Sequence, residues 1–292
     1  MTGGRDSSSP RRLRGASVGA GRSRAGAVPD LAELAGRLTE RDRELCRLVW
    51  EHRVLTSLHC AQLVFASEVT ARHRLVILTG LRVLDRFRPT WQLGQGSPPW
   101  HYVLGPAGAA VLAAEQAITV AQLGWRRDRA LAIAHSPQLA HQVGVNGFFS
   151  ALAAHARRRR DAALAAWWPE RRCAERWGQL VRPDGYGRWQ QAGGEVDFFL
   201  EYDRGTEDLG RLLAKLDAYA ELAAVSRIAT PVLFWLPTPA REERFRAAAA
   251  RPGVPVATAS GPAGVSPAGP VWLPLPADAH ARRLPLAALA TL

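Results

Sequence analysis

Apolar residues recur at helical spacing from residue 31 onward, and they predict three successive helices near 40–52, 57–65 and 69–87. The first has a start signal, because Thr39 can accept hydrogen bonds from free backbone amides. Two β-prone pieces, PTWQL and WHYVL, then flank the turn-forming run GQGSPP, and a helix of small residues follows over 105–116. Three helices and a hairpin in this order are typical of a winged helix-turn-helix, here over residues 31–120.

The pattern changes after Pro137, where helices and strands alternate. Helices are predicted at 138–160, 209–225 and 241–250, and strands at 165–171, 180–189, 195–203, 230–236 and 254–259. The order αβββαβαβ predicts an α/β domain with a small mixed sheet over residues 138–260. The fold class is therefore α+β, with two domains.

Three further segments complete the predicted organisation. Residues 121–137 are interpreted as a connector, and residues 261–292 as a Pro/Gly-rich extension in which 271–275 is a candidate edge strand. Residues 1–30 are rich in Gly, Ser and Arg and are predicted to be disordered. The six arginines of this tail against two aspartates suit a phosphate-binding arm, and a start-site extension is an equal alternative.

Charge narrows the choice of partners. The 292 residues include 38 basic and 26 acidic side chains, for a net charge of +12. Such an excess attracts polyanions, nucleic acid first and an acidic membrane surface second. All basic residues but one are arginine, which a GC-rich coding background explains as well as selection for DNA affinity does. The exception is Lys215.

Several function classes are not supported by the sequence. The three cysteines, Cys46, Cys60 and Cys173, lie far apart and in no CxxC spacing, so neither a disulfide framework nor a zinc site is expected. Cys46 and Cys60 fall on apolar helix faces and are predicted to be buried. No apolar run approaches the ~18 residues of a membrane span, and no secretory signal is present. We expect a soluble, cytoplasmic protein.

The third predicted helix is the candidate recognition helix. Near its start Thr70, Arg72, His73 and Arg74 are placed to contact bases, and near its end Arg82, Arg86 and Arg88 are placed to contact phosphates. Two alternatives stay open. The arginines can form an ordinary solvated helix face, and winged helices also serve as protein-binding modules. The excess of basic over acidic residues favours DNA as the partner.

A group of carboxylates marks the α/β domain. Period-2 alternation in the strand over 195–203 puts Glu201 and Asp203 on one face, and Asp184 on the neighbouring strand can approach the same place. Clustered carboxylates repel one another unless a cation or a proton offsets their charge. Hard oxygen ligands suit Mg²⁺ or Mn²⁺, so the three acids are candidate metal ligands.

Lys215 follows in the next predicted helix. A compact ammonium there would neutralise the acids or stabilise a transition state in a way that a planar guanidinium does not copy. The alternative is a salt bridge of no catalytic consequence with Asp217 or Glu207. His141 and Asn146 could also face the acids, although we favour capped core residues for them.

These residues resemble the PD-(D/E)xK nuclease superfamily, whose core is also αβββαβ. The matching positions are Pro183-Asp184 and then Glu201 on the next strand. The resemblance implies that the two acids bind a divalent metal and that a lysine two residues after the second acid assists the attacking water. Here that position is Asp203, which puts activity in doubt. Some members have the lysine on the following helix, where Lys215 lies.

Residues 38–225 as a whole resemble the actinobacterial replication-relaxation proteins. The matching segments are LTERDRELCRLVWEHRVLTSLHCAQLVF, LAHQVGVN, WWPE, RPDG and FFLEYDRGTEDLGRLLAKLDAY. The resemblance implies a DNA-binding protein of plasmid or mobile-element replication or transfer, with plasmid replication or transfer proteins as candidate partners.

Three hypotheses follow. The protein is a metal-dependent nickase or endonuclease using Asp184, Glu201, Asp203 and Lys215, or its nuclease-like domain only binds DNA or a replication partner. The third hypothesis is a winged-helix transcriptional regulator whose C-terminal domain senses a ligand or mediates oligomerisation.

Overall fold

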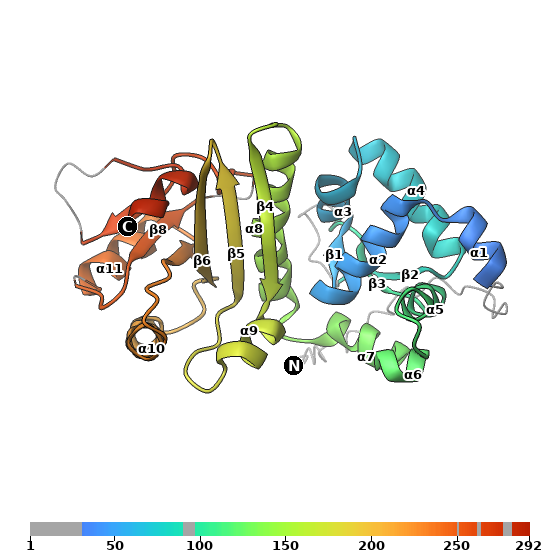
Figure 1. The fold of residues 1–292 in the computed structure, drawn as a ribbon, viewed down its shortest axis with the longest axis horizontal. Coiled ribbons are helices and arrows are strands. Elements are labelled where there is room, and N and C mark those ends of the chain that lie inside the picture. The colour runs from blue at the N-terminus through green and yellow to red at the C-terminus, as the bar shows by residue number, and fades with distance from the viewer. Residues whose placement is uncertain (1–30, 90–96, 250, 262–263, 277–281) are drawn as a thin grey trace, which may run out of the picture.

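The computed structural model describes residues 31–89, 97–249, 251–261, 264–276 and 282–292. It is a mixed α and β structure with a three-stranded sheet near the N-terminus and a six-stranded sheet in the C-terminal half (Figure 1). The tail expected to be disordered, residues 1–30, lies outside the described residues, as does most of the segment PTWQL.

Short helices surround the small sheet in the N-terminal part. Its elements are α1 (Leu31–Arg37), α2 (Glu40–His52), β1 (Leu55–Thr56), α3 (Ser57–Val64), α4 (Glu68–Gly80), β2 (Leu84–Phe87), β3 (His101–Leu104) and α5 (Pro106–Glu115). The sheet has the order β1-β3-β2, and both pairs are antiparallel. Thr39 caps α2 as expected, accepting a hydrogen bond from the backbone N–H of Asp42.

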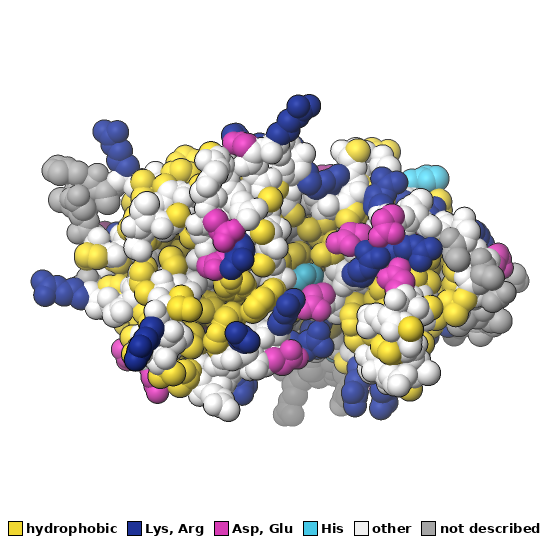
Figure 2. All heavy atoms as spheres, in the orientation of Figure 1, with side chains coloured by type: hydrophobic (Ala, Val, Ile, Leu, Met, Phe, Trp, Pro, Cys, Tyr) yellow, Lys and Arg dark blue, Asp and Glu magenta, His cyan; other side chains and the backbone are white. Residues whose placement is uncertain are grey.

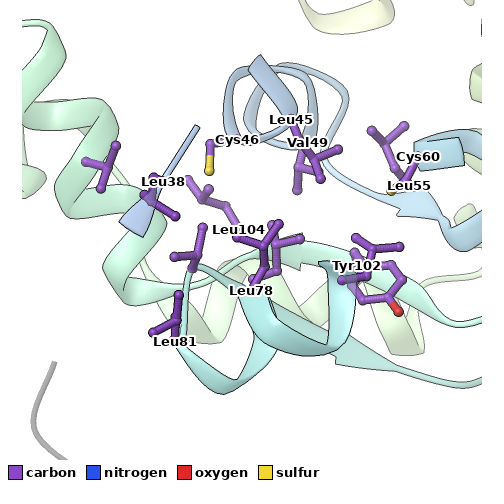
Figure 3. Packing of buried hydrophobic residues seen from close by; sticks show 14 of the residues in the cluster. Leu38, Leu45, Cys46, Val49, Leu55, Cys60, Leu78, Leu81, Tyr102 and Leu104 are labelled. Carbon is purple, nitrogen blue, oxygen red and sulfur yellow. The ribbon is translucent and has the colours of Figure 1, made fainter. Parts of the chain in front are cut away.

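Side chains from α2, α4 and the sheet meet in one core, which Figure 3 shows from close by. Leu45, Leu78 and Leu55 are fully buried there. Cys46 and Cys60 are buried free thiols, which confirms the sequence prediction. Burying this apolar face is the main source of stability for helices too short to persist alone.

The prediction of one helix over 69–87 is wrong in its second half. Helix α4 ends at Gly80, Arg82 has a left-handed backbone (φ 59°), and residues 84–87 form β2. Leu81 and Leu84 continue the helical spacing, but tertiary contacts decide the structure. Leu84 pairs with Leu104 in the sheet, and both are buried.

The connector is more structured than expected. It contains α6 (Val120–Leu123), α7 (Arg127–Ala132) and the 3-10 turn η1 (Ile133–His135). Arg127 forms an ion pair with Asp85 of β2 at 2.8 Å, and Ile133 is buried. The segment is therefore packed against the small sheet.

The C-terminal part is built on the larger sheet. Its elements are α8 (Leu139–Arg157), β4 (Ala162–Pro169), α9 (Glu170–Trp177), β5 (Gly185–Gln191), β6 (Gly194–Tyr202), α10 (Leu209–Ser226), β7 (Val232–Leu236), α11 (Pro239–Ala248), β8 (Val256–Ser260), β9 (Leu273–Leu275) and η2 (Leu286–Thr291). The sheet order is β4-β5-β6-β7-β8-β9. Strands β6, β7 and β8 are parallel to one another, and the other neighbours are antiparallel.

Alternation along β6 places its side chains as predicted. Phe198 and Leu200 pack with α8, whereas Phe199 packs on the opposite face with α10. The first helix and the strands agree with the sequence to within a few residues, except that the second strand begins at Gly185 rather than Leu180. Helix α9 was missed, because it is mostly charged and only Cys173 of it is buried.

The C-terminal extension contributes to the core as well as to the surface. Strand β9 confirms the candidate edge strand near residues 271–275. Leu286 and Leu289 of η2 are fully buried against the same cluster as α8. Trp272 is also fully buried, and its indole N–H donates to the carbonyl of Pro267 at 2.7 Å.

Helix α8 joins the two parts, since it lies between β4 and α3 (Figure 1). Asn146 is fully buried and donates to the backbone carbonyls of His52 and Val54 at 3.1 and 2.6 Å. The rings of His52 and Trp167 stack with centroids 3.4 Å apart. The two hydrogen bonds of Asn146 and the stacked rings, whose His52 Nδ1 and Trp167 Nε1 have no partner among the described residues, hold the two sheets relative to each other.

Basic and acidic side chains are interspersed on the face of the molecule drawn in Figure 2. Arg47 of α2, for example, pairs with Glu40, Glu44 and Glu115. Arginines in such networks have their charge offset locally. The sites that remain for a polyanion must therefore be found residue by residue.

Candidate functional site

Glu201 is at the centre of the acidic group, on the β6 face that is covered by α10. Its carboxylate is 1% exposed. Lys215 Nζ lies 2.7 Å from one carboxylate oxygen, and the Tyr219 hydroxyl donates to the other at 2.5 Å. Lys215 and Tyr219 are four residues apart on α10, so they share one face of the helix. The sequence thus places two donors over one buried acid.

Asp184 lies immediately before β5, where the chain enters the sheet beside the end of β6. One carboxylate oxygen accepts the backbone N–H of Tyr202 at 2.7 Å, and the other is 3.0 Å from His141 Nε2. The residue after Asp184 pairs with Leu200 in the sheet register. Asp184 and Glu201 therefore come close to each other, as the sequence predicted.

The charges in this group are strongly coupled. Burial raises the pKa of Glu201 to about 7, and the negative charge of Asp184 adds to the shift. Burial alone would lower the pKa of Lys215, but the charges of Glu201 and Asp184 outweigh it and raise that pKa. Burial and nearby negative charge also have opposite effects on the pKa of His141. Burial lowers its pKa, and the hydrogen bond and charge of Asp184 reverse the effect, giving a net rise.

Asp203 does not join the other two acids. Its side chain forms an ion pair with Arg241 of α11 and accepts the backbone N–H of Gly205 at 2.7 Å. Arg241 also donates to the carbonyl of Glu207 at 2.6 Å. Within the described ranges, no three His, Cys, Asp or Glu side chains are arranged to hold a metal ion.

Sequence reasoning missed part of this group. His141 faces Asp184, although the sequence favoured a core histidine, and Tyr219 and Arg241 were not singled out at all. The four-residue spacing of Lys215 and Tyr219 was the available signal for Tyr219. Asn146, by contrast, is a buried structural residue at the junction of the two parts.

The candidate DNA-contacting residues near the start of α4 are exposed, except for Arg74. Arg72 and His73 are exposed, and so is Thr70, whose backbone N–H donates to the capping Ser67 at 3.2 Å. Val69 and Val76 are 73% and 53% exposed. Positions 69, 72, 73 and 76 share one helix face, which is therefore an open surface with two valines, one arginine and one histidine.

Arg74 points the other way. Its guanidinium donates to both carboxylate oxygens of Asp42, at 3.0 and 2.6 Å, and to the carbonyl of Arg37 at 2.8 Å. Asp42 is fully buried. Burial would raise the pKa of Asp42, but hydrogen bonds from Arg74 and Thr39 outweigh it, and the pKa is lowered. Arg74 holds α4 against α2.

The remaining candidates lie on the hairpin side. The guanidinium of Arg86 lies over the Trp100 ring at 4.2 Å from its centroid, and that of Arg88 lies over the same ring at 4.3 Å. Such cation–π contacts orient side chains that would otherwise be mobile. Arg82 is half-buried at the turn that ends α4. Arg86 and Arg88 therefore share the Trp100 ring, whereas Arg82 lies at the turn between α4 and β2.

No curated protein and no solved structure matches the chain. None of the described helices combines the length and apolar character needed to cross a membrane.

The profile of the family described as replication-relaxation matches residues 46–233, which span α3, α4, the junction helix α8 and the group around Glu201. The chain therefore belongs to the replication-relaxation family.

Proposed function

We propose that this protein binds DNA during the replication or transfer of plasmids or other mobile elements. In this proposal α2–α4 with β2 and β3 act as a winged helix, and α4 enters the major groove. The family, the net charge of +12 and the open face of α4 support it.

The observation that carries the proposal is the composition of the α4 face. Arg72 is exposed and placed to donate to guanine or phosphate, and Val69 and Val76 are placed to contact thymine methyl groups. Isolated exposed valines are common, but two on one face beside an arginine suit a groove that offers both methyl groups and acceptors. Arg74 is excluded from this contact, because it pairs with Asp42.

The test is DNA binding by fluorescence anisotropy, with a labelled duplex of mixed sequence and a salt titration. We expect affinity to fall with salt, and Arg72→Ala to weaken binding about tenfold, equivalent to about 1.4 kcal/mol. Arg244→Ala, which removes an exposed arginine of α11, is the matched control and should change little. Equal effects of the two substitutions would show that only net charge matters and would refute a role for α4.

A second candidate function, metal-dependent nicking of DNA, is favoured by the group around Glu201. The single lysine of the chain is 2.7 Å from Glu201, and Asp184 is near both, as in a PD-(D/E)xK site whose lysine has moved to the next helix. Mg²⁺ is commonly held by one or two carboxylates together with substrate phosphates. Asp184 and Glu201 would hold it, and the ion would supply charge to stabilise a developing phosphorane. Asp203 is excluded by Arg241.

Nicking is tested with supercoiled plasmid and Mg²⁺ or Mn²⁺. We expect relaxed circles from the wild type, and none from Asp184→Asn or Lys215→Met. Glu221→Gln, an exposed acid on the same helix as Lys215, is the control and should be active. Cleavage that persists in the first two variants would exclude this site. A wild type without cleavage would refute nicking and leave the DNA-binding proposal standing.

A further inference from the structure

A groove of about 1030 Å³ runs along α8, on the side away from the Glu201 group. One wall is α3 with the chain leading into α4, and it includes His59, Phe65 and Glu68. The other wall is formed by Tyr202, Trp235 and residues 265–267. Segments from both halves of the molecule therefore enclose it.

The floor of the groove is made of small residues on one face of α8. They are Ala140, Gly144, Gly147, Ala151 and Ala154, and Arg158 continues the same face at the end of the helix. From Ala140 to Arg158 the helix rises about 27 Å, at 1.5 Å per residue. A volume of about 1030 Å³ spread along a floor of that length suits one extended chain.

His59 supplies a second observation that points to a ligand. Its side chain is 7% exposed, and Nδ1 accepts the backbone N–H of Thr56 at 3.3 Å. Burial lowers the pKa of His59 to about 3, so the ring is neutral and its hydrogen is on Nε2. Nε2 lies 3.3 Å from the position that a Cβ on Gly147 would take, and it has no hydrogen-bond partner among the described residues. The N–H donor of this largely buried side chain thus faces the groove.

Charge and position identify the occupant. Arg157 and Arg158 line the far end of the groove against one acid, Glu68. Arg157 also donates to the carbonyls of Gln62 and Phe65 at 3.0 and 2.9 Å, which fixes the end of α3 as a wall. Ser67 and Glu68 belong both to the groove and to the start of α4. The groove is therefore continuous with the proposed DNA-contacting face.

We infer that this groove binds a single strand of DNA that extends from the duplex held by α4. The inference rests on the proposed function. Phosphates would meet the Nε2–H of His59 and the guanidinium of Arg158, while bases would lie against the ring of Tyr202, the partly exposed aromatic residue of the wall, since stacking on aromatic side chains is tolerant of sequence. The two DNA forms would thus occupy different surfaces of one protein.

The experiment compares two labelled probes by fluorescence anisotropy, a single strand of about twelve thymidines and a duplex of equal length. Ala151→Phe fills the floor of the groove, and Ala247→Phe, on an exposed position of α11, is its matched control. We expect Ala151→Phe to weaken single-strand binding about tenfold and to change duplex binding less than twofold. Ala247→Phe should change neither. Arg72→Ala should show the opposite preference and weaken duplex binding.

Arg158→Glu is a second variant, chosen because an exposed charge reversal leaves the core intact. It should also weaken the single-strand complex. Unchanged single-strand affinity in both groove variants overturns the inference, and so does a wild type that binds the duplex but not the single strand. Failure of Arg72→Ala to affect the duplex would instead contradict the proposed role of α4, so the two failures are distinguishable.

Discussion

Replacing Arg74 by alanine tests whether this arginine supports the fold or contacts DNA. In the structure it closes an ion pair with Asp42, which is fully buried at the start of α2. The substitution leaves the carboxylate in place without its cation. Two hydrogen bonds to Asp42 from Thr39 remain, one from the backbone N–H and one from the hydroxyl.

Breaking a buried ion pair by removing one partner costs about 3–5 kcal/mol. The Arg74 side chain is 23% exposed, and Thr39 still satisfies part of the carboxylate, so we expect the lower end, about 3 kcal/mol. At about 2–4 °C for each kcal/mol, the melting temperature should fall by about 6–12 °C. Arg72→Ala, two residues away and exposed, should change stability by less than about 0.5 kcal/mol.

The pH dependence of the stability loss tests the role of Arg74 more sharply than the size of the loss at one pH. The pKa of Asp42 is lowered in the folded protein, so its contribution to stability is present above the unfolded pKa and is lost as pH falls through the folded pKa. Without Arg74, burial should raise the pKa of Asp42, and the carboxyl will take up a proton instead. The loss in the free energy of unfolding should therefore be largest near pH 7 and shrink toward pH 3.

Urea unfolding of both variants at pH 7 and pH 4, followed by circular dichroism, measures these differences. DNA binding by Arg74→Ala is measured well below its melting temperature and should stay within a few-fold of wild type. A variant that is as stable as wild type but has lost DNA binding would refute the structural role assigned to Arg74.

Three further predictions concern the junction, the hairpin and the acidic group. Asn146→Leu removes the donor to two buried carbonyls and should lower the free energy of unfolding by about 2–4 kcal/mol, measured in urea. Trp100→Ala should reduce both DNA affinity and the slope of its salt dependence, since Arg88 loses the ring that orients it, whereas Trp100→Phe should preserve them. Lys215→Met leaves Glu201 without its cation. The pKa of Glu201 is already raised above the unfolded value, so its contribution is lost as pH rises, and the variant should lose more stability at pH 9 than at pH 6. Equal losses at the two pH values would contradict this account of Glu201.

Local chemistry made much of the fold predictable. Thr39 caps α2 because a side-chain oxygen satisfies an amide of the same turn, and the turn between β5 and β6 forms over Ala192 and Gly193 as the AGG sequence suggests. Alternation along β6 follows from the two faces of any strand. None of these features needs a distant part of the chain.

Predictions from local sequence patterns were wrong where contacts with distant parts of the chain decided the structure. Leu81 and Leu84 fit a continuing helix, but pairing of Leu84 with β3 gives more burial and ends α4 early. Likewise, Leu286 and Leu289 lie in a segment rich in Pro and Ala, and only the completed sheet offers the cluster in which they are buried.

In the acidic group, too, some features follow from the sequence and others only from the tertiary structure. The sequence alone determined that Asp184 lies close to the strand that carries Glu201 and that Lys215 is on the next helix, because strand alternation and chain order set those positions. Only the tertiary structure decided which charges meet. Side chains from α8 and α11, far away in the chain, give His141 to Asp184 and Arg241 to Asp203. A buried carboxylate forms an ion pair with whichever cation the tertiary packing places near it. That packing depends on the whole fold.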